Sequence, residues 1–179
     1  AHNGWVRSLA FLRRQSCVLT GGDDDVLKLW QLPLFGQQSM SQPRLLWQEK
    51  TAGWVHAIAL SPDEKTTAIG GENTITLYNT ASGQKLCQWF HEECTHSNSD
   101  DNQRQSSSPL TKRSAVRSLM FSPDGQCLAS CGDDNVIRLW SVDSHRDNLT
   151  SDDRTALARP IAELVGHTDC VRVVKFSVD

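Results

Sequence analysis

Four residues of metal-ligating type lie close together in the sequence. Cys87, His91, Cys94 and His96 form a C-x3-H-x2-C-x-H cluster, and thiolate sulfur and imidazole nitrogen are atoms that bind zinc. Cys87 falls within an apolar strand pattern, whereas the other three follow on a polar stretch, so no single element positions all four. We therefore expect no metal site here, and we expect no cofactor elsewhere in the chain.

Other patterns with a chemical meaning are equally weak. The run Asp23-Asp24-Asp25 is acidic enough to suggest a cation site, but it lacks the oxygen-ligand spacing of a calcium loop and is typical of a turn. Asn148-Leu149-Thr150 matches a glycosylation acceptor, which matters only in a secreted chain. The sequence contains no G-x-S-x-G, G-x-x-x-x-G-K or H-E-x-x-H motif. We therefore expect no catalytic residues and a protein that is not an enzyme.

An internal repeat defines the elements that carry these residues. The run VRSLAF at 6–11 recurs as VRSLMF at 116–121 with five of six residues identical, and weaker copies stand at 55–60 and 171–176. Each of the first three copies is followed by a turn, a second apolar run, an acidic turn and a short run ending in an aromatic residue; these segments are 17–30, 67–78 and 127–140. Further strand candidates lie at 44–47, 85–89 and 161–164. β-Branched and aromatic residues between Gly, Asp, Asn and Pro predict four strands in each unit.

Sheets of this kind must be stacked, because a sheet with two apolar faces needs a neighbour on each side to exclude water. The repeat resembles that of the WD-repeat family, whose β-propeller blades each contain four antiparallel strands. The resemblance implies an all-β fold with blades at about 2–50, 51–113 and 114–166, and the first strand of a further blade in 167–179. Three blades are about half of a usual ring. We therefore expect the remaining blades to come from the same chain or from another copy.

The resemblance also implies a hydrogen-bonded tetrad in each blade, made of a His, a Ser or Thr, an Asp and a Trp. The matching residues are His2, Thr20, Asp24 and Trp30 in the first blade, Ser130, Asp134 and Trp140 in the third, and His167 at the start of the next. Lys112 stands at the histidine position of the third blade. The second blade departs from the pattern, with Thr51, Ile69, Glu72 and Tyr78. The Trp-Asp dipeptide is absent, because Gln31, Asn79 and Ser141 follow the three aromatic residues.

Members of the family tend to bind partners around the mouth of the central channel, where the first strands begin. Carried over by position, the partner-binding residues are Trp5, Arg7, Asp23, Trp54, His56, Arg117, Asp133 and Arg172. Trp and Arg often dominate interface energetics, so we expect a protein or peptide partner of acidic or phosphorylated character. The alternative is that the tryptophans pack against adjacent blades and the arginines pair with the turn aspartates.

A polar insertion at 95–114 joins the second unit to the third and should lie at the channel mouth. It is rich in Ser, Asn, Asp and Gln and almost free of apolar residues, so it cannot bury enough surface to offset its ordering, and we expect it to be flexible. It is either an expanded loop or a docking segment, with Ser106-Ser107-Ser108-Pro109 as a phosphorylation patch.

Composition narrows the function further. Lys and Arg number 18 against 21 Asp and Glu, a balance that disfavours nucleic-acid and membrane-surface binding. The apolar runs are far shorter than the ~20 residues of a membrane span. Six cysteines, several within strand patterns, indicate reduced thiols and a cytoplasmic or nuclear protein. We expect a non-catalytic scaffold or adaptor within a larger protein or complex. Two alternatives remain open: a propeller attached to a catalytic domain outside this segment, and a subunit that contacts nucleic acid.

Overall fold

The computed structural model describes residues 1–33, 42–91, 114–142 and 159–177, and all of its regular structure is β-strand. The first sheet contains β1 (Val6–Leu12), β2 (Cys17–Gly22), β3 (Val26–Gln31) and β4 (Arg44–Lys50). The second contains β5 (Ala57–Leu60), β6 (Thr66–Gly70), β7 (Thr74–Asn79) and β8 (Lys85–Phe90), and the third β9 (Val116–Phe121), β10 (Cys127–Gly132), β11 (Ile137–Ser141) and β12 (Ala162–Leu164).

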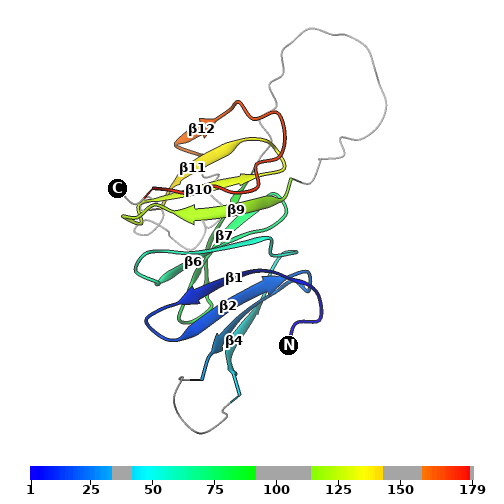
Figure 1. Cartoon of the computed structure of the whole chain (residues 1–179), viewed down its shortest axis with the longest axis vertical. Coiled ribbons are helices and arrows are strands. Elements are labelled where there is room, and N and C mark those ends of the chain that lie inside the picture. The colour runs from blue at the N-terminus through cyan, green and yellow to red at the C-terminus, as the bar shows by residue number, and fades with distance from the viewer. Residues whose placement is uncertain (34–41, 92–113, 143–158, 178–179) are drawn as a thin grey trace.

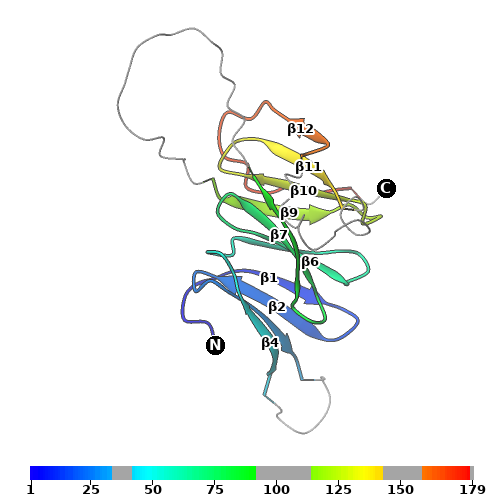
Figure 2. The same ribbon diagram turned by 180° about the vertical axis from the view of Figure 1, so that it is seen from behind.

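Each sheet is antiparallel, and its strands pair in the order of the sequence. The three sheets stack one upon another along the long axis of the molecule (Figure 1). The view from behind shows the same order, with the second sheet between the other two (Figure 2). The expected all-β fold of stacked four-stranded sheets is confirmed.

In the second and third sheets, the turn that joins the first and second strands is closed by a serine side chain. In the second sheet the Ser61 hydroxyl oxygen accepts a hydrogen bond from the Thr66 N–H at 2.9 Å. The Ser122 hydroxyl does the same for the Cys127 N–H at 2.9 Å. Pro follows each serine and presets the backbone for the turn. The Ser-Pro-Asp pattern therefore fixes where these second strands begin.

Two apolar clusters hold the sheets together. One lies between the first and second sheets and includes Leu19, Leu29, Val55 and Ile69. The other lies between the second and third, where the rings of Trp89 and Trp140 stack with centroids 5.4 Å apart. The side chains that the period-two pattern places on the facing sides of the sheets thus form the core.

The contact between consecutive sheets repeats along the chain. The Val55 N–H donates to the Gly22 carbonyl, and the Val116 N–H donates to the Gly71 carbonyl, each at 3.0 Å. The Val171 N–H donates to the Gly132 carbonyl at the same distance. Val171 therefore lies against the third sheet as Val55 lies against the first, in the place of a first strand of a further blade.

The structure differs from the predicted strands at this last segment. Residues 171–176 have no assigned strand, although the sequence predicts one. A first strand is assigned through its ladder with a second strand, and no such partner lies within the described residues. Likewise β5 begins at Ala57 instead of Val55, whose N–H is bonded to the neighbouring sheet.

The predicted insertion at 95–114 lies outside the described residues except for Ser114, but both of its flanks are placed. The His91 N–H donates to the Asn73 carbonyl at 2.8 Å, and the Ser114 N–H donates to the Asn73 side-chain oxygen at 2.6 Å. The Asn73 N–H in turn donates to the Ser114 carbonyl at 2.9 Å. One residue of the β6–β7 turn thus fixes the two points between which the insertion runs.

Over the described ranges, the chain contains no helix of the length and apolarity that a membrane crossing requires. The five cysteines within those ranges, Cys17, Cys87, Cys127, Cys131 and Cys170, are free thiols.

Candidate binding surface at the channel mouth

The residues at the starts of the first strands form a surface that we call the channel mouth. Its members are Trp5, Arg7, Trp54, His56, Arg117 and Arg172. At its centre the Arg7 side chain lies between the rings of Trp5 and Trp54. The Arg7 guanidinium carbon lies 5.9 Å from the centroid of the Trp5 ring and 5.2 Å from that of Trp54. Trp5 is 76% exposed and Trp54 43% exposed. Both rings therefore keep apolar surface open to solvent while the cation fixes their spacing.

Two arginines at equivalent positions each pair with an aspartate of a neighbouring turn. Arg117 makes a bidentate pair with Asp133, at 2.7 Å from Nε and 2.8 Å from Nη2. Arg7 contacts Asp23 in the same way, with Nη2 2.9 Å from Oδ2. Hydrogen bonding from Arg117 lowers the pKa of Asp133, although burial opposes the shift. The arginines thus follow the alternative in which they pair with turn aspartates, whereas the two tryptophans remain exposed.

His56 and Arg172 complete the channel mouth. The ring of His56 meets that of Trp54 edge to face, with centroids 6.1 Å apart. Burial lowers the pKa of His56, and the charges of Arg117 and Arg7 lower it further, so the ring is neutral at neutral pH. Its Nδ1 is buried without a hydrogen-bond partner in the described part of the chain. Arg172 is exposed and forms no ion pair with any described residue.

The first sheet brings all four of its predicted tetrad residues together. His2 Nδ1 lies 2.9 Å from Asp24 Oδ1, and His2 Nε2 lies 2.7 Å from the Thr20 hydroxyl. The Trp30 indole N–H donates to the same hydroxyl at 2.9 Å. Burial opposes ionisation of Asp24, but hydrogen bonds from His2 and the Asn3 N–H lower the pKa of its carboxyl. This network ties the segment before β1 to the turn that carries Asp23.

The third sheet builds its network with a histidine that the sequence analysis did not assign. The Trp140 indole N–H donates to the Ser130 hydroxyl at 2.8 Å. His91, from the end of β8, lies 3.3 Å from Asp134, and its Nε2 lies 3.0 Å from Nη1 of Arg138. Arg138 also contacts Asp134, and its Nε donates to Glu163 at 2.9 Å. Lys112, expected at the histidine position, lies outside the described residues.

The residues of the degenerate second tetrad are dispersed. Thr51 donates its hydroxyl hydrogen to the Gly53 carbonyl at 2.7 Å, while Ile69 and Tyr78 belong to the apolar core. Glu72 pairs through its backbone with Ala115. His167 is exposed and makes no hydrogen bond within the described part of the chain.

The structure also places the residues considered for metals. Burial raises the pKa of the Cys87 thiol to about 11, and His91 is already held by Asp134 and Arg138. Cys94 and His96 lie outside the described residues, as do the Asn148 acceptor and the serines at 106–108. In the acidic run, Asp23 contacts Arg7 and Asp24 contacts His2, so these two carboxylates are held by different side chains.

Comparison with known proteins agrees with this architecture. The family model described as "WD domain, G-beta repeat" matches residues 1–31 and 106–141. The chain is 28% identical to Striatin-4 of Mus musculus over 80% of this chain and 18% of that protein. It is 27% identical to the Small ribosomal subunit protein RACK1z of Arabidopsis thaliana over 79% of this chain and 40% of that protein. The chain thus spans less than half of the length of these relatives.

The fold is shared with solved structures. The WD40 repeats of RRP9 align with a TM-score of 0.68 and 18% identity, over 97% of this chain and 42% of that one. The structure of U3-55K aligns with a TM-score of 0.67 over 97% of this chain and 43% of that one. Proteins built from such repeats generally act as scaffolds that bind other proteins, and they are typically not catalysts. The family-model match, the relatives and the shared fold together support a WD-repeat propeller fragment, with three blades followed by a segment in the place of the next first strand.

Proposed function

We propose that this chain is a non-catalytic scaffold module that holds a protein or peptide at the channel mouth. The observation that carries the proposal is the stack of Trp5, Arg7 and Trp54. Two large indole rings stay partly exposed although a folded chain gains free energy by burying apolar surface. Exposed Trp and Arg side chains in fixed positions are the groups that most often dominate protein interfaces.

The charge of the channel mouth supports an acidic or phosphorylated partner. Arg172 has no carboxylate partner within the described residues, and the Arg7 and Arg117 side chains remain 30% and 39% exposed in their ion pairs. An incoming carboxylate or phosphate would find planar guanidinium groups able to bind it with two hydrogen bonds. The neutral His56 beside them adds no competing charge.

The same proposal places the module within a larger protein or complex, in the cytoplasm or nucleus. Free thiols in the strands fit a reducing compartment. The open faces of the stack fit a ring whose other blades come from the same polypeptide or from another copy.

The test is a joint change of Trp5 and Trp54 to Ala in the full-length protein, followed by quantitative affinity capture. We expect partners held at the channel mouth to be recovered about tenfold less or worse, because removal of interface tryptophans commonly costs more than 1 kcal/mol each. Phe90→Ala is the matched control, since Phe90 is also 43% exposed but lies on the outer strand β8. An unchanged set and amount of partners in the double variant would reject the proposal.

A further inference from the structure

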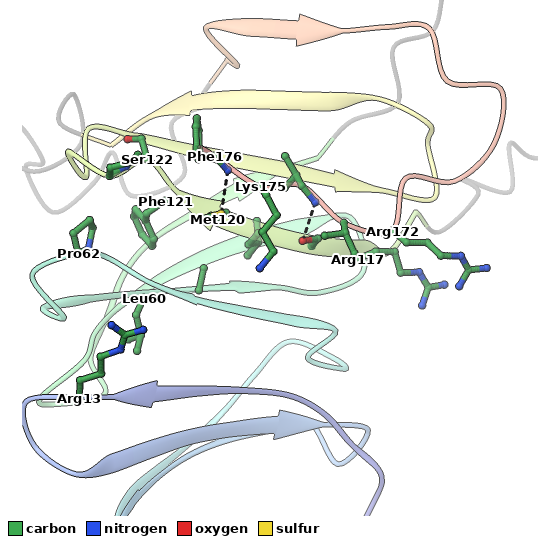
Figure 3. A pocket seen from close by; sticks show the side chains of 16 residues that line it. Arg13, Leu60, Pro62, Arg117, Met120, Phe121, Ser122, Arg172, Lys175 and Phe176 are labelled. Carbon is green, nitrogen blue, oxygen red and sulfur yellow. Dashed lines mark hydrogen bonds between the residues drawn. The ribbon is translucent and has the colours of Figure 1, made fainter. Parts of the chain in front are cut away.

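A second candidate site lies along the channel wall, below the channel mouth. It is a pocket of about 800 Å³ between β5, β9 and the segment 172–176, with Arg13 of the β1–β2 turn at one end (Figure 3). This volume is within the range of ligand-binding pockets, which is about 300–1,000 Å³. We call it the channel pocket.

The channel pocket is cationic. Its lining includes Arg13, Arg117, Arg172 and Lys175, and no Asp or Glu is among its described lining residues. Arg117 is paired with Asp133, but Arg13, Arg172 and Lys175 form no ion pair with any residue that the structure describes. Glu64 lies near Arg13, and its carboxylate accepts the backbone N–H of Arg13 at 3.0 Å and of Arg14 at 3.3 Å. The pocket therefore retains uncompensated positive charge.

Cations lie at both ends of the pocket, and Lys175 lies among the apolar groups between them. Figure 3 shows Arg13 at one end, Arg117 and Arg172 at the other, and Lys175 between them. Leu60, Met120 and Phe176 form apolar wall along the pocket, and none of the three is fully buried. A ligand that fits must therefore carry negative charge at its ends and apolar surface in its middle.

An extended peptide meets these requirements best. The wall follows five residues of β9, from Arg117 to Phe121, which span about 13 Å at the usual rise of a strand. A peptide of roughly four to six residues has this length when extended. A compact polyphosphate would pair with the cations but leave the apolar wall exposed to water. A nucleic acid would present phosphates without an apolar side chain to contact that wall.

We propose that the channel pocket binds an extended acidic segment of a partner protein, with carboxylates at both ends and an apolar side chain between them. The proposal rests on the proposed function, because the segment belongs to a partner that is held at the channel mouth. It adds Arg13, at one end of the pocket, and Lys175, between the two ends, as the residues that select acidic sequence.

The probe is an array of hexapeptides with Glu at both ends and one Leu or Phe at a central position, the other positions being Ser. A matched array carries Gln in place of Glu. The full-length protein is applied to both, and the affinities of bound peptides are measured by fluorescence anisotropy. We expect the Glu peptides to bind and the Gln peptides to bind about fivefold more weakly, since each of the two exposed ion pairs contributes up to about fivefold.

Variants separate the pocket from a general effect of charge. The double change Arg13→Gln and Lys175→Gln should weaken the Glu peptides roughly tenfold. The matched pair Arg14→Gln and Lys65→Gln removes exposed cations of the same types that do not line the pocket, and it should leave binding unchanged. Thermal unfolding of all variants establishes that each is folded, which we expect because these four side chains are exposed.

Three results would overturn the inference: equal binding of Glu and Gln peptides, equal weakening by both variant pairs, or binding of inositol hexakisphosphate with no bound peptide. These failures are distinct from failure of the proposed function. If partner capture is lost in the Trp5 and Trp54 variant but unaffected by Arg13→Gln and Lys175→Gln, the channel mouth binds partners and the channel pocket does not.

Discussion

Gly22, at the end of β2, packs directly against the backbone that carries Trp5. A β-carbon at residue 22 would lie 1.8 Å from the Trp5 carbonyl oxygen and 2.8 Å from its carbonyl carbon. The same glycine accepts the Val55 N–H, so it joins two sheets as well as supporting the channel mouth. Gly132 occupies the equivalent place in the third sheet, where a β-carbon would lie 2.1 Å from the Ala115 carbonyl oxygen. Glycine is required at both positions because any β-carbon would clash with main-chain atoms, which cannot move aside as a side chain can.

We predict that Gly22→Ala lowers the free energy of unfolding by more than about 2 kcal/mol, because the added methyl group must displace backbone. Gly53→Ala is the control: a β-carbon at residue 53 meets nothing within 4 Å, so its effect should stay within about 0.5 kcal/mol. Urea unfolding followed by tryptophan fluorescence measures both. Equal midpoints for the two variants would contradict the close contact at Gly22.

At the scale of elements, His91 connects the end of β8 to the third sheet. It is 1% exposed and faces Asp134, Arg138 and Glu163. A neutral ring with its proton on Nδ1 donates to Asp134 and accepts from Arg138 through Nε2, which satisfies both nitrogens. Burial lowers the pKa of His91, and the charge of Arg138 adds to the effect while Asp134 and Glu163 oppose it. The histidine therefore stays neutral where an unfolded histidine would take up a proton.

This difference predicts how stability depends on pH. Above the unfolded pKa of about 6.5 neither state binds the proton, so the contribution of His91 is fully present. As the pH falls below that value, His91 binds a proton in the unfolded state but not in the folded state. The free energy of unfolding therefore falls by up to about 1.4 kcal/mol per pH unit. The loss continues until the pH reaches the folded pKa of about 4.

His91→Gln isolates this contribution, because the amide accepts and donates hydrogen bonds but does not titrate. We expect the wild-type chain to lose stability more steeply than the variant between pH 6.5 and about 4.5, with the curves parallel above pH 7. His56 also has a lowered pKa and remains in both proteins, so its effect cancels in the comparison. Denaturant unfolding at a series of pH values measures the slopes, and identical slopes would show that His91 does not titrate differently on folding.

At the scale of the whole molecule, the sequence predicts the stack of sheets because each repeat contains the local patterns that indicate its strands and turns. Residues 6–31 contain three short apolar runs separated by two polar turns, the second rich in Gly and Asp, and the same pattern recurs at 116–141. His91 was missed because residues 92–113 separate it from the blade whose network it joins. Arg13 and Lys175 were missed for a different reason: they are far apart in sequence, and only the stacking of sheets brings them to one pocket. Local patterns thus predict the strands of each blade. Contacts between blades join residues far apart in the sequence, so local patterns do not predict them.

The first sheet ends the stack with one apolar face uncovered. Leu19 and Leu29 face the second sheet and are buried, whereas Leu9 and Phe11 on β1 are 64% and 49% exposed. Leu45 on β4 is 38% exposed as well. A large apolar sheet face in water promotes association with any complementary surface. The chain expressed alone should therefore self-associate through this face.

We predict that the isolated chain grows in apparent mass with concentration, and that Leu9→Glu with Phe11→Lys largely abolishes this growth, because charges on that face must be desolvated on contact. The control is Leu86→Glu with Phe90→Lys: these residues are similarly exposed, at 38% and 43%, but lie on the outer strand of the second sheet, whose two faces are already covered. Size-exclusion chromatography with light scattering over a range of micromolar concentrations measures the mass. If the control suppresses association as strongly as the Leu9 and Phe11 change, the contact surface is not the open face of the first sheet, and outer strands drive the association instead.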